Sequence, residues 1–258
     1  MSYLPGKFVW FEHVSKDAAK AKAFYSGLFG WSVNPMPMGE QTYDIISNGA
    51  TGIGGFRTAE AGMPSHWASY LSVADVDKSF AKATASGAKA LMPPMDYGDV
   101  GRAAAVADPT GAGFALWKGA QGDPADVEKT PAGGWMWNEL HSSDAKAAVA
   151  FYEKAFGFSH EAMDMGPGGT YYVLKDAAGN RRAGVMQKSP DMPMPSNWLP
   201  YVSVADCDAS AAKATKLGAM SLAMPPTDIP NIGRFAVVID PVGAAIAIMK
   251  PLDMMKMG

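Results

Sequence analysis

The 258-residue chain contains two copies of one long segment, and this duplication limits its possible folds more than any other feature. The run FVWFEHVSKDAAKAKAFYSGLFGW at 8–31 matches WMWNELHSSDAKAAVAFYEKAFGF at 135–158, so that Glu12 aligns with Glu139, 127 positions later. A repeat of this length indicates a duplicated domain rather than a solenoid unit. Two later pairs also match, namely 66–77 with 197–208 and 98–118 with 230–250.

The chain is therefore divided into a first domain at 1–120, a linker at 121–133 and a second domain at 134–258. The linker region is rich in Gly, Pro and Ala, which is typical of a connection between domains. A weaker repeat lies within the first domain, where SYLSVAD (69–75) and the helix-like run after it resemble the segment that ends at Asp17. Each domain is then two copies of a strand–helix–strands module, and the chain has four modules.

The bulk composition excludes several classes of protein. The formal net charge is −3 and no run of Lys or Arg occurs, so we expect no nucleic-acid partner. The single cysteine, Cys207, cannot form an internal disulfide. No signal peptide and no membrane-spanning run is present, which predicts a soluble, cytoplasmic protein. The 18 methionines fit either adaptable core filling or a pliable apolar pocket.

The local pattern at the start of the chain predicts a strand followed by an amphipathic helix. Residues 8–15 are apolar and β-prone, and Asp17 is suited to cap the helix that follows. The buried stripe of that helix recurs at i, i+3, i+4 and i+7 from Ala21, and Gly30 marks its end. The sequences DPTG at 108–111 and DPVG at 240–243 are turn signals before a closing strand.

These motifs together resemble the vicinal oxygen chelate superfamily, which includes glyoxalases, bleomycin resistance proteins and extradiol dioxygenases. The motifs are D-x(6)-FY-x(3)-FG in each half, SVADVD or SVADCD before a helix, and a closing DPxGAxxA. The resemblance implies an α+β fold in which paired βαβββ modules, four in total, form curled mixed sheets around cavities. In enzymes of the family it also implies a divalent metal in the cavity, held by His, Glu or Gln from the first and last strands of the modules.

The positions that the resemblance assigns to metal ligands carry other side chains here. On the first strands, Trp10 and Trp137 stand seven residues before Asp17 and Asp144. The first-strand positions of the second modules are Ala68 and Leu199, and the closing-strand positions, seven residues after the Asp of DPxG, are Ala115 and Ala247. Only Gln187, of uncertain register, remains. Because indole and alkyl groups cannot coordinate a hard cation, we expect no metal and no other cofactor.

Side-chain alternation along the first strand separates Glu12 from His13. Successive strand residues face opposite sides, so Trp10 and Glu12 share the face that the resemblance directs into the cavity, while His13 faces away. In the second domain the same face carries Trp137, Glu139 and His141. Glu12 and Glu139 are either structural acceptors that fix module packing, or catalytic groups whose pKa apolar walls raise.

Other residues on these faces are candidates for ligand contact. His141 is a candidate for proton transfer, with a structural role as the alternative. Trp10 and Trp137 either line the pocket or pack in the core. Arg102 and Arg234 either bind a ligand carboxylate or pair with Glu12 or Glu139. The predicted ligand-binding set is Trp10, Trp137, Tyr70, Tyr201, Arg102 and Arg234, and the predicted catalytic set is Glu12, Glu139 and His141.

Three functions follow from this interpretation. The first is a metal-independent member of the superfamily that binds a small organic molecule in an apolar, aromatic cavity, and either sequesters it or turns it over by acid–base chemistry. The second is a metal-dependent lyase or dioxygenase with ligands outside the usual positions. The third is a scaffold without chemistry. We expect a monomer of two pseudo-symmetric domains or a homodimer.

Overall fold

The computed structural model describes residues 2–38, 41–192 and 194–252, which form four copies of a strand, a helix and three strands. The first copy comprises β1 (Phe8–Ser15), α1 (Ala18–Phe29), β2 (Ser32–Met38), β3 (Gln41–Asn48) and β4 (Thr51–Thr58). The second comprises β5 (His66–Ser72), α2 (Val76–Ala85), β6 (Lys89–Asp96), β7 (Gly101–Ala107) and β8 (Gly113–Gly119). The third comprises β9 (Trp135–Ser142), α3 (Ala145–Phe156), β10 (Ser159–Asp164), the 3₁₀ turn η1 (Gly166–Gly168), β11 (Thr170–Lys175) and β12 (Arg181–Gln187). The fourth comprises β13 (Asn197–Ser203), α4 (Cys207–Lys216), β14 (Ser221–Ile229), β15 (Gly233–Ile239) and β16 (Ala245–Pro251).

Each helix begins at an aspartate, as the sequence pattern predicted. The side chain of Asp17 accepts a hydrogen bond from the backbone N–H of Lys20, which satisfies one of the unpaired donors of the first turn. Asp75, Asp144 and Asp206 cap the other three helices in the same way. Gly30 ends α1 in the left-handed conformation at φ 74°, where a residue without Cβ meets no steric penalty.

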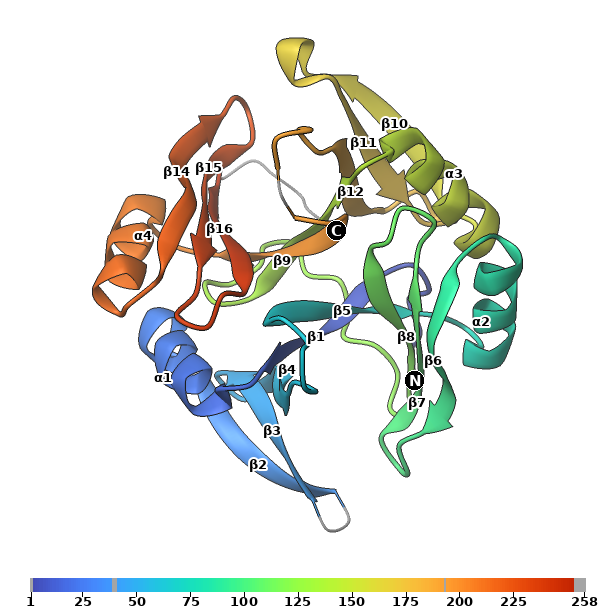
Figure 1. Cartoon of the computed structure of the whole chain (residues 1–258), viewed down its shortest axis with the longest axis horizontal. Helices are drawn as coiled ribbons and strands as arrows, with labels where there is room; N and C mark the ends of the chain where they lie inside the picture. Colours follow the sequence, from blue (N-terminus) through green and yellow to red (C-terminus); the bar gives the residue numbers. More distant parts are fainter. Residues whose placement is uncertain (1, 39–40, 193, 253–258) are drawn as a thin grey trace.

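The four modules pair within each half of the chain. The first half forms one eight-stranded sheet in the order β2-β3-β4-β1-β5-β8-β7-β6, and the second half forms its copy in the order β10-β11-β12-β9-β13-β16-β15-β14. In the centre of each sheet the first strands of two modules run antiparallel, with Trp10 opposite Tyr70 and Trp137 opposite Tyr201. The predicted α+β fold and tandem duplication are therefore confirmed (Figure 1).

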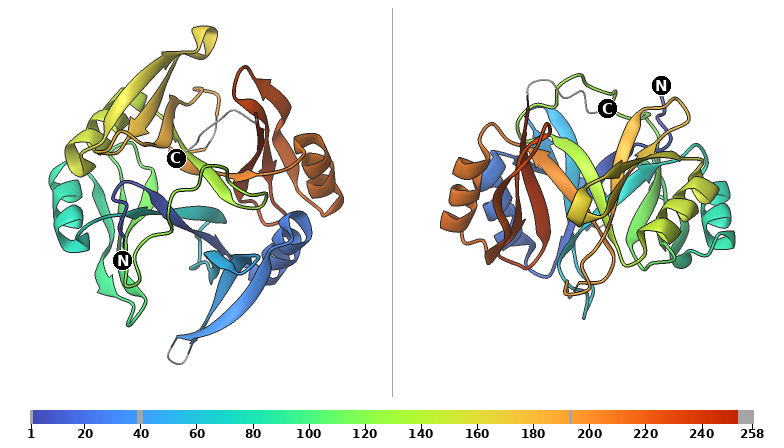
Figure 2. Two further views of the ribbon diagram at one scale, coloured as in Figure 1. Left: turned by 180° about the vertical axis from the view of Figure 1, so that it is seen from behind. Right: turned by 90° about the horizontal axis from the view of Figure 1, so that it is seen from above.

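The helices pair across the two halves, one pair at each of two opposite edges of the molecule (Figure 1). Helix α1 of the first half lies beside α4 of the second, and α2 lies beside α3 (Figures 1 and 2). One apolar cluster joins Leu71 and Phe114 of the first half to Leu140 and Tyr152 of the second. The other cluster joins the first and fourth modules in the same way. Each half thus completes the core of the other. Among the described residues no helix is long and apolar enough to cross a membrane.

A buried tyrosine–aspartate bond crosses this interface at two related places. The Tyr25 hydroxyl of α1 donates to Oδ2 of Asp240 at 2.9 Å, and the Tyr152 hydroxyl of α3 donates to Oδ2 of Asp108 at 3.2 Å. Both aspartates belong to the D-P-x-G turns and also accept backbone N–H groups of those turns through Oδ1. The turn motif therefore fixes the packing of the two halves as well as the course of the chain.

His13 belongs to this interface and not to a site beside Glu12, as strand alternation predicted. Its ring is fully buried, and Nε2 lies 2.8 Å from Oδ2 of Asp240. Burial alone would raise the pKa of Asp240, but the hydrogen bond and charge of His13, with backbone N–H groups of the turn, hold that pKa below its usual value. The aligned residue in the other half is Leu140, so this ion pair occurs at only one of the two related places in the described structure.

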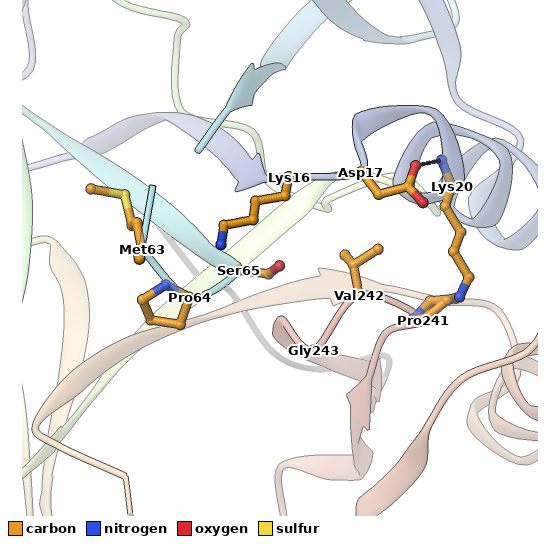
Figure 3. Close-up of a pocket in the computed structure, with 10 residues that line it drawn as sticks. Lys16, Asp17, Lys20, Met63, Pro64, Ser65, Pro241, Val242 and Gly243 are labelled. Atoms are coloured by element: carbon orange, nitrogen blue, oxygen red, sulfur yellow. Dashed lines mark hydrogen bonds between the residues drawn. The ribbon is translucent and has the colours of Figure 1, made fainter. Parts of the chain in front are cut away.

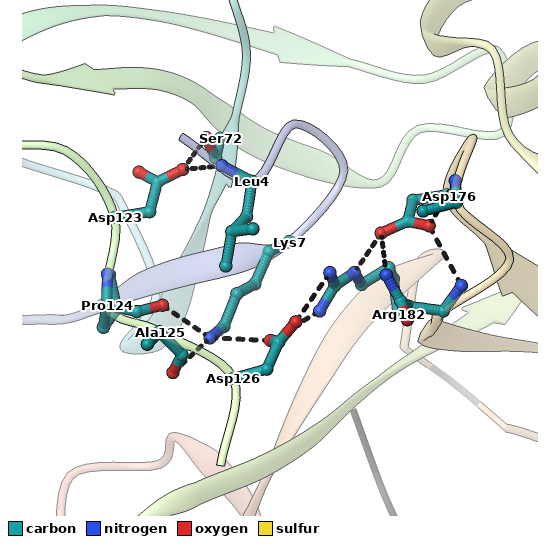
Figure 4. A network of polar contacts seen from close by, with 11 residues as sticks. Leu4, Lys7, Ser72, Asp123, Pro124, Ala125, Asp126, Asp176 and Arg182 are labelled. Carbon is teal, nitrogen blue, oxygen red and sulfur yellow. Dashed lines mark hydrogen bonds and ion pairs between the residues drawn. The ribbon is translucent and has the colours of Figure 1, made fainter. Parts of the chain in front are cut away.

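The linker at 121–133 forms hydrogen bonds to both sheets (Figure 4). Asp123 accepts from the backbone N–H of Leu4 and from the hydroxyl of Ser72. Asp126 accepts two hydrogen bonds from Arg182, at 2.7 and 2.9 Å, and lies 3.0 Å from Nζ of Lys7. Because Lys7 precedes β1 and Arg182 lies in β12, this one carboxylate connects the two halves.

We predict that Asp126→Ala lowers the free energy of unfolding by about 1–3 kcal/mol, because the Arg182 side chain is 1% exposed and would retain only Asp176 as its anion. Lys7→Met is the matched control and should cost less than about 1 kcal/mol, since Lys7 is nearer to solvent. Urea unfolding of both variants measures the difference. Equal losses would show that Asp126 does not connect the halves through Arg182.

Candidate functional site

In the first sheet a buried carboxylate, that of Glu12, collects three side-chain donors. The Tyr43 hydroxyl donates to Oε1 at 3.0 Å, and the Tyr70 hydroxyl donates to Oε2 at 3.2 Å. The Arg57 Nε group donates to the same Oε2 at 2.7 Å. The indole N–H of Trp10 donates to the Tyr43 hydroxyl at 3.0 Å, which orients that hydroxyl toward Glu12. We call the sheet surface that carries these residues the first carboxylate face.

The second sheet repeats this arrangement around Glu139. The Tyr171 hydroxyl donates to Oε2 at 2.8 Å, and the Tyr201 hydroxyl donates to Oε1 at 2.9 Å. Nε2 of His141 lies 2.8 Å from the same Oε1. Trp137 donates to the Tyr171 hydroxyl at 2.9 Å, as Trp10 does to Tyr43. This surface is the second carboxylate face, and it brings together four residues that the sequence predicted for the site.

The basic partner of each carboxylate comes from a different strand in the two halves. Arg57 lies on β4 opposite Val14 of β1, whereas His141 of β9 lies opposite Met186 of β12. In the first half the basic residue therefore lies on β4 and the apolar residue on β1. In the second half the basic residue lies on β9 and the apolar residue on β12. A buried carboxylate without a nearby positive or donor group is costly, and both arrangements retain one such partner for each glutamate.

A glycine in the neighbouring strand makes room for each tyrosine. A Cβ placed on Gly55 would lie 2.1 Å from Oη of Tyr43, and one on Gly184 would lie 1.9 Å from Oη of Tyr171. Neither distance is possible for real atoms, so any larger residue would push the tyrosine away from its glutamate. The glycine-rich run 52–56 is therefore explained here by close approach of a side chain to the strand.

The surroundings of Glu139 stabilise its ionised carboxylate over its protonated form. Burial alone would raise its pKa, but the hydrogen bond and charge of His141 and the bonds from Tyr171 and Tyr201 outweigh burial and lower it. The expectation that apolar walls raise the pKa of this residue is therefore wrong. In turn, burial and the charge of Glu139 raise the pKa values of Tyr171 and Tyr201, which keeps both phenols protonated as donors.

The positions that would hold a metal in the family do meet on these faces, but without ligating atoms. Strand pairing places Trp10 opposite Tyr70, and Tyr70 opposite Ala115. Gln187, the one remaining candidate, was wrongly considered for this face. It accepts from the backbone N–H of Ala145 and donates to the carbonyl of Ser143 at the start of α3. Within the described ranges, no three His, Cys, Asp or Glu side chains cluster as a metal site.

Arg102 and Arg234 do not reach either carboxylate, and their predicted pairing with Glu12 or Glu139 is wrong. Arg102 forms two hydrogen bonds to Asp77 of α2 at 2.8 Å and a salt bridge to Asp96. Arg234 contacts Asp208 and Asp228 in the same way. Both arginines alternate with the residues of the carboxylate faces along β7 and β15, so their side chains point toward the helices instead.

The sequence did not point to Tyr43, Tyr171 or Arg57, which supply three of the contacts to the glutamates. The two tyrosines are 128 positions apart, one more than Glu12 and Glu139, so they could have been aligned by allowing one inserted residue. Arg57 has no counterpart in the second half and left no repeat signal. Finding it requires the register of β4 against β1, which is set by tertiary pairing.

A surface hollow of about 560 Å³ lies away from both glutamates. It is formed where the start of α1, the loop before β5 and the turn before β16 meet, so that both halves contribute (Figure 3). Lys16 and Lys20 lie at its edge with Pro64 and Val242. A second hollow of about 50 Å³ lies between β1 and β9 and is lined by Phe11 and Trp137 among others.

Comparison with known families identifies two matching segments in this chain. The model described as the Glyoxalase/Bleomycin resistance protein/Dioxygenase superfamily matches residues 7–116 and 138–248. These two ranges contain Glu12 and Glu139 with the tyrosine and basic side chains that contact them.

Similar proteins include whole-length relatives. CFP32 of Mycobacterium tuberculosis (strain CDC 1551 / Oshkosh), provisionally named a glyoxylase, is 37% identical over 255 residues, covering 96% of each chain. The anthracycline biosynthesis protein DauV of Streptomyces sp. (strain C5) is 30% identical over 264 residues, covering 96% of this chain and 94% of DauV.

Solved structures with the same fold have much lower identity. The Mn(II)-bound glyoxalase from Novosphingobium aromaticivorans is 16% identical with a TM-score of 0.66, over 98% of this chain and 85% of that one. The 2,3-dioxygenase LapB from Pseudomonas sp. KL28 is 12% identical with a TM-score of 0.63, over 100% of this chain and 97% of that one. At these identities the likeness concerns the fold alone.

We predict that Gly55→Ala lowers the free energy of unfolding by about 2 kcal/mol, because the new methyl group displaces Tyr43 and leaves Glu12 with one donor fewer. Gly52→Ala on the same strand is the control. Its Cβ would lie 3.4 Å from Ile45, an ordinary contact, so its stability should be unchanged or slightly raised. Thermal and urea unfolding compare the two, and equal effects would contradict the close-approach explanation.

We predict that Glu139→Gln costs about 2 kcal/mol at pH 7 and progressively less as the pH falls below the ordinary glutamate pKa. The folded pKa of Glu139 is lowered, so its stabilising charge is present above its ordinary value of about 4.3 and is lost as the pH falls through the lowered value. Urea unfolding from pH 3 to 8 measures the difference. Glu161→Gln, on an exposed strand, is the control and should show little effect. A pH-independent loss for Glu139→Gln would contradict the assignment.

Proposed function

Because the chain belongs to the glyoxalase/bleomycin resistance protein/dioxygenase superfamily, we propose that it binds a small organic molecule on a carboxylate face without a metal ion. The observation that carries the proposal is the set of donors on each glutamate. Tyrosine hydroxyls and one basic side chain occupy the carboxylate oxygens from the protein itself. The glutamate then serves as a fixed anchor for aromatic side chains.

The residues present do not fit the divalent metal that the fold family implies. Hard cations bind several oxygen or nitrogen ligands at once, and each face offers a single carboxylate. Around it, Trp10, Ala68 and Ala115 stand where ligands are expected in the first half. Arg57 bonded directly to Glu12 adds a positive charge that would repel a cation. No step of the proposed function passes through a metal.

What remains on these faces is suited to bind an organic molecule. Aromatic side chains provide large apolar contact area together with a polar edge, and the hydroxyls and Arg57 provide fixed polar contacts. Glu12 is the residue that we propose for any proton transfer, while His141 is proposed to hold Glu139 as its hydrogen-bond partner. Glu139, with its lowered pKa, is a weak base and is proposed to act as a structural anchor.

The first test is the metal content of untagged protein, combined with its melting temperature before and after chelation and with added Ni, Zn, Mn and Fe(II). We expect no stoichiometric metal and no shift on chelation, because no metal site contributes to folding. A tightly held metal whose removal lowers the melting temperature would contradict the proposal and favour a metal-dependent lyase or dioxygenase.

The second test is a melting-temperature screen of small organic molecules. A ligand that binds only the folded state raises its stability, so at least one compound should raise the melting temperature, and Glu12→Gln should reduce that rise. If no compound from a broad screen has any effect, the binding function fails and a scaffold role without chemistry is favoured.

A further inference from the structure

The two carboxylate faces are equivalent in their glutamates but differ in access. The Arg57 side chain on Glu12 is 44% exposed, whereas that of His141 on Glu139 is 14% exposed. Tyr70 of the first face is partly exposed, but its counterpart Tyr201 is buried. A ligand from solvent can therefore reach the polar groups of the first face more directly than those of the second.

The strand residues at the base of each face, which we call its floor, differ in side-chain volume between the two faces. On the first face the floor consists of Ala68, Ala103, Ala105 and Ala115. In the first sheet, register places Ala68 beside Glu12, Ala105 opposite Ala115, and Ala103 opposite Trp117. In the second sheet three of these alanines are replaced by larger residues, which join an apolar cluster of their own. These counterparts are Leu199 for Ala68, Val237 for Ala105 and Phe235 for Ala103. The second face is thus filled by larger side chains, whereas on the first face Ala68 and Ala105 are half-buried and Ala103 and Ala115 are buried.

Aromatic rings surround the alanine floor of the first face. The ring of Trp117 lies 6.1 Å from that of Tyr70 and 6.4 Å from that of Tyr97, measured between centroids. At the matching positions of the second sheet, Met249 replaces Trp117 and Ile229 replaces Tyr97. Rings that stand around a floor of small residues offer edge and face contacts to another flat ring.

Methionine side chains extend this surface along β6. Pairing of β6 with β7 places Met92 opposite Ala105 and Met95 opposite Ala103, on the same side of the sheet as the alanine floor. Met95 is exposed, and the thioether of Met92 accepts from the Tyr97 hydroxyl. Flexible thioethers adapt to ligands of irregular outline and contact aromatic rings favourably. Part of the high methionine content therefore lies on this face.

The charges of the first face favour an uncharged ligand. Glu12 and Arg57 neutralise one another, and Glu60 adds a further negative charge near Arg57. An anionic ligand would meet no uncompensated positive charge here. A neutral molecule with a carbonyl or hydroxyl oxygen could still accept from the exposed end of the Arg57 guanidinium, since its Nε alone bonds to Glu12.

We propose that only the first carboxylate face binds the ligand, and that this ligand is a flat, uncharged aromatic molecule with a hydrogen-bond acceptor at its edge. The second face is a filled copy that supports the fold. This inference rests on the proposed function and adds the location and the ligand class to it.

The test is calorimetric titration of the full chain with 2-naphthamide, 2-naphthoate and decahydro-2-naphthamide. These probes share a carboxyl-derived group but differ in charge or in aromaticity. Ala68→Leu and Ala105→Val copy the second sheet and should each weaken 2-naphthamide binding by about tenfold or more through overlap with the ring. Val237→Ala alters only the second face and should leave the affinity unchanged.

Trp117→Met removes an aromatic wall without adding volume to the floor, so it keeps the test valid if a floor variant fails to fold. It should also weaken 2-naphthamide binding. Melting curves of each variant report folding. The proposal is supported if the wild type binds 2-naphthamide at least about tenfold more tightly than the other two probes and if only the first-face variants lose affinity.

Three results would overturn the inference while leaving the proposed function intact. One is a ligand whose affinity responds to Val237→Ala but not to Ala68→Leu, Ala105→Val or Trp117→Met. Another is a compound from the melting-temperature screen that binds while 2-naphthamide does not. The third is 2-naphthoate binding as tightly as 2-naphthamide. If no compound binds at all, the proposed function fails first.

Discussion

The carboxylate faces depend on the hydrogen bonds that other side chains form with the buried glutamate at the centre of each sheet. Glu12 and Glu139 each hold two tyrosine hydroxyls and one basic side chain, and every one of these groups comes from another strand or from two residues along the same strand. Glu12 therefore connects four strands of the first sheet, and Glu139 connects three strands of the second. The glutamate also explains the glycine opposite each tyrosine, because the hydroxyl reaches the glutamate only where no Cβ intervenes.

The duplication also constrains the fold, because neither half of the chain completes its own hydrophobic core. The helices of one half pack against those of the other, and the tyrosine of each F-Y pair donates to the aspartate of the other half's D-P-x-G turn. A pair of domains with a shared core cannot vary independently at this interface. The carboxylate faces lie on the other side of the sheets and are free to differ, as the alanine floor and its filled counterpart do.

The sequence alone predicted the features that depend on local spacing. The repeat gave the domain order, aspartates predicted all four helix starts, and alternation separated His13 from Glu12. The sequence could not supply the strand register, because register depends on tertiary pairing. For this reason Arg57 was missed, and Arg102 was assigned to the wrong face of the sheet. For Glu139 the sequence left two alternatives open, and the lowered pKa excludes the one in which apolar walls raise it, because bonds from His141, Tyr171 and Tyr201 outweigh burial.

The most direct test of the account is a high-resolution crystal structure of the protein grown with millimolar Mn(II), with anomalous scattering measured for the metal. The account predicts no anomalous peak at Glu12 or Glu139, and hydrogen bonds from Tyr43, Tyr70 and Arg57 still in place on Glu12. A Mn(II) peak within bonding distance of Glu12, with those donors displaced, would contradict it, because the glutamate would then be a metal ligand rather than an anchor.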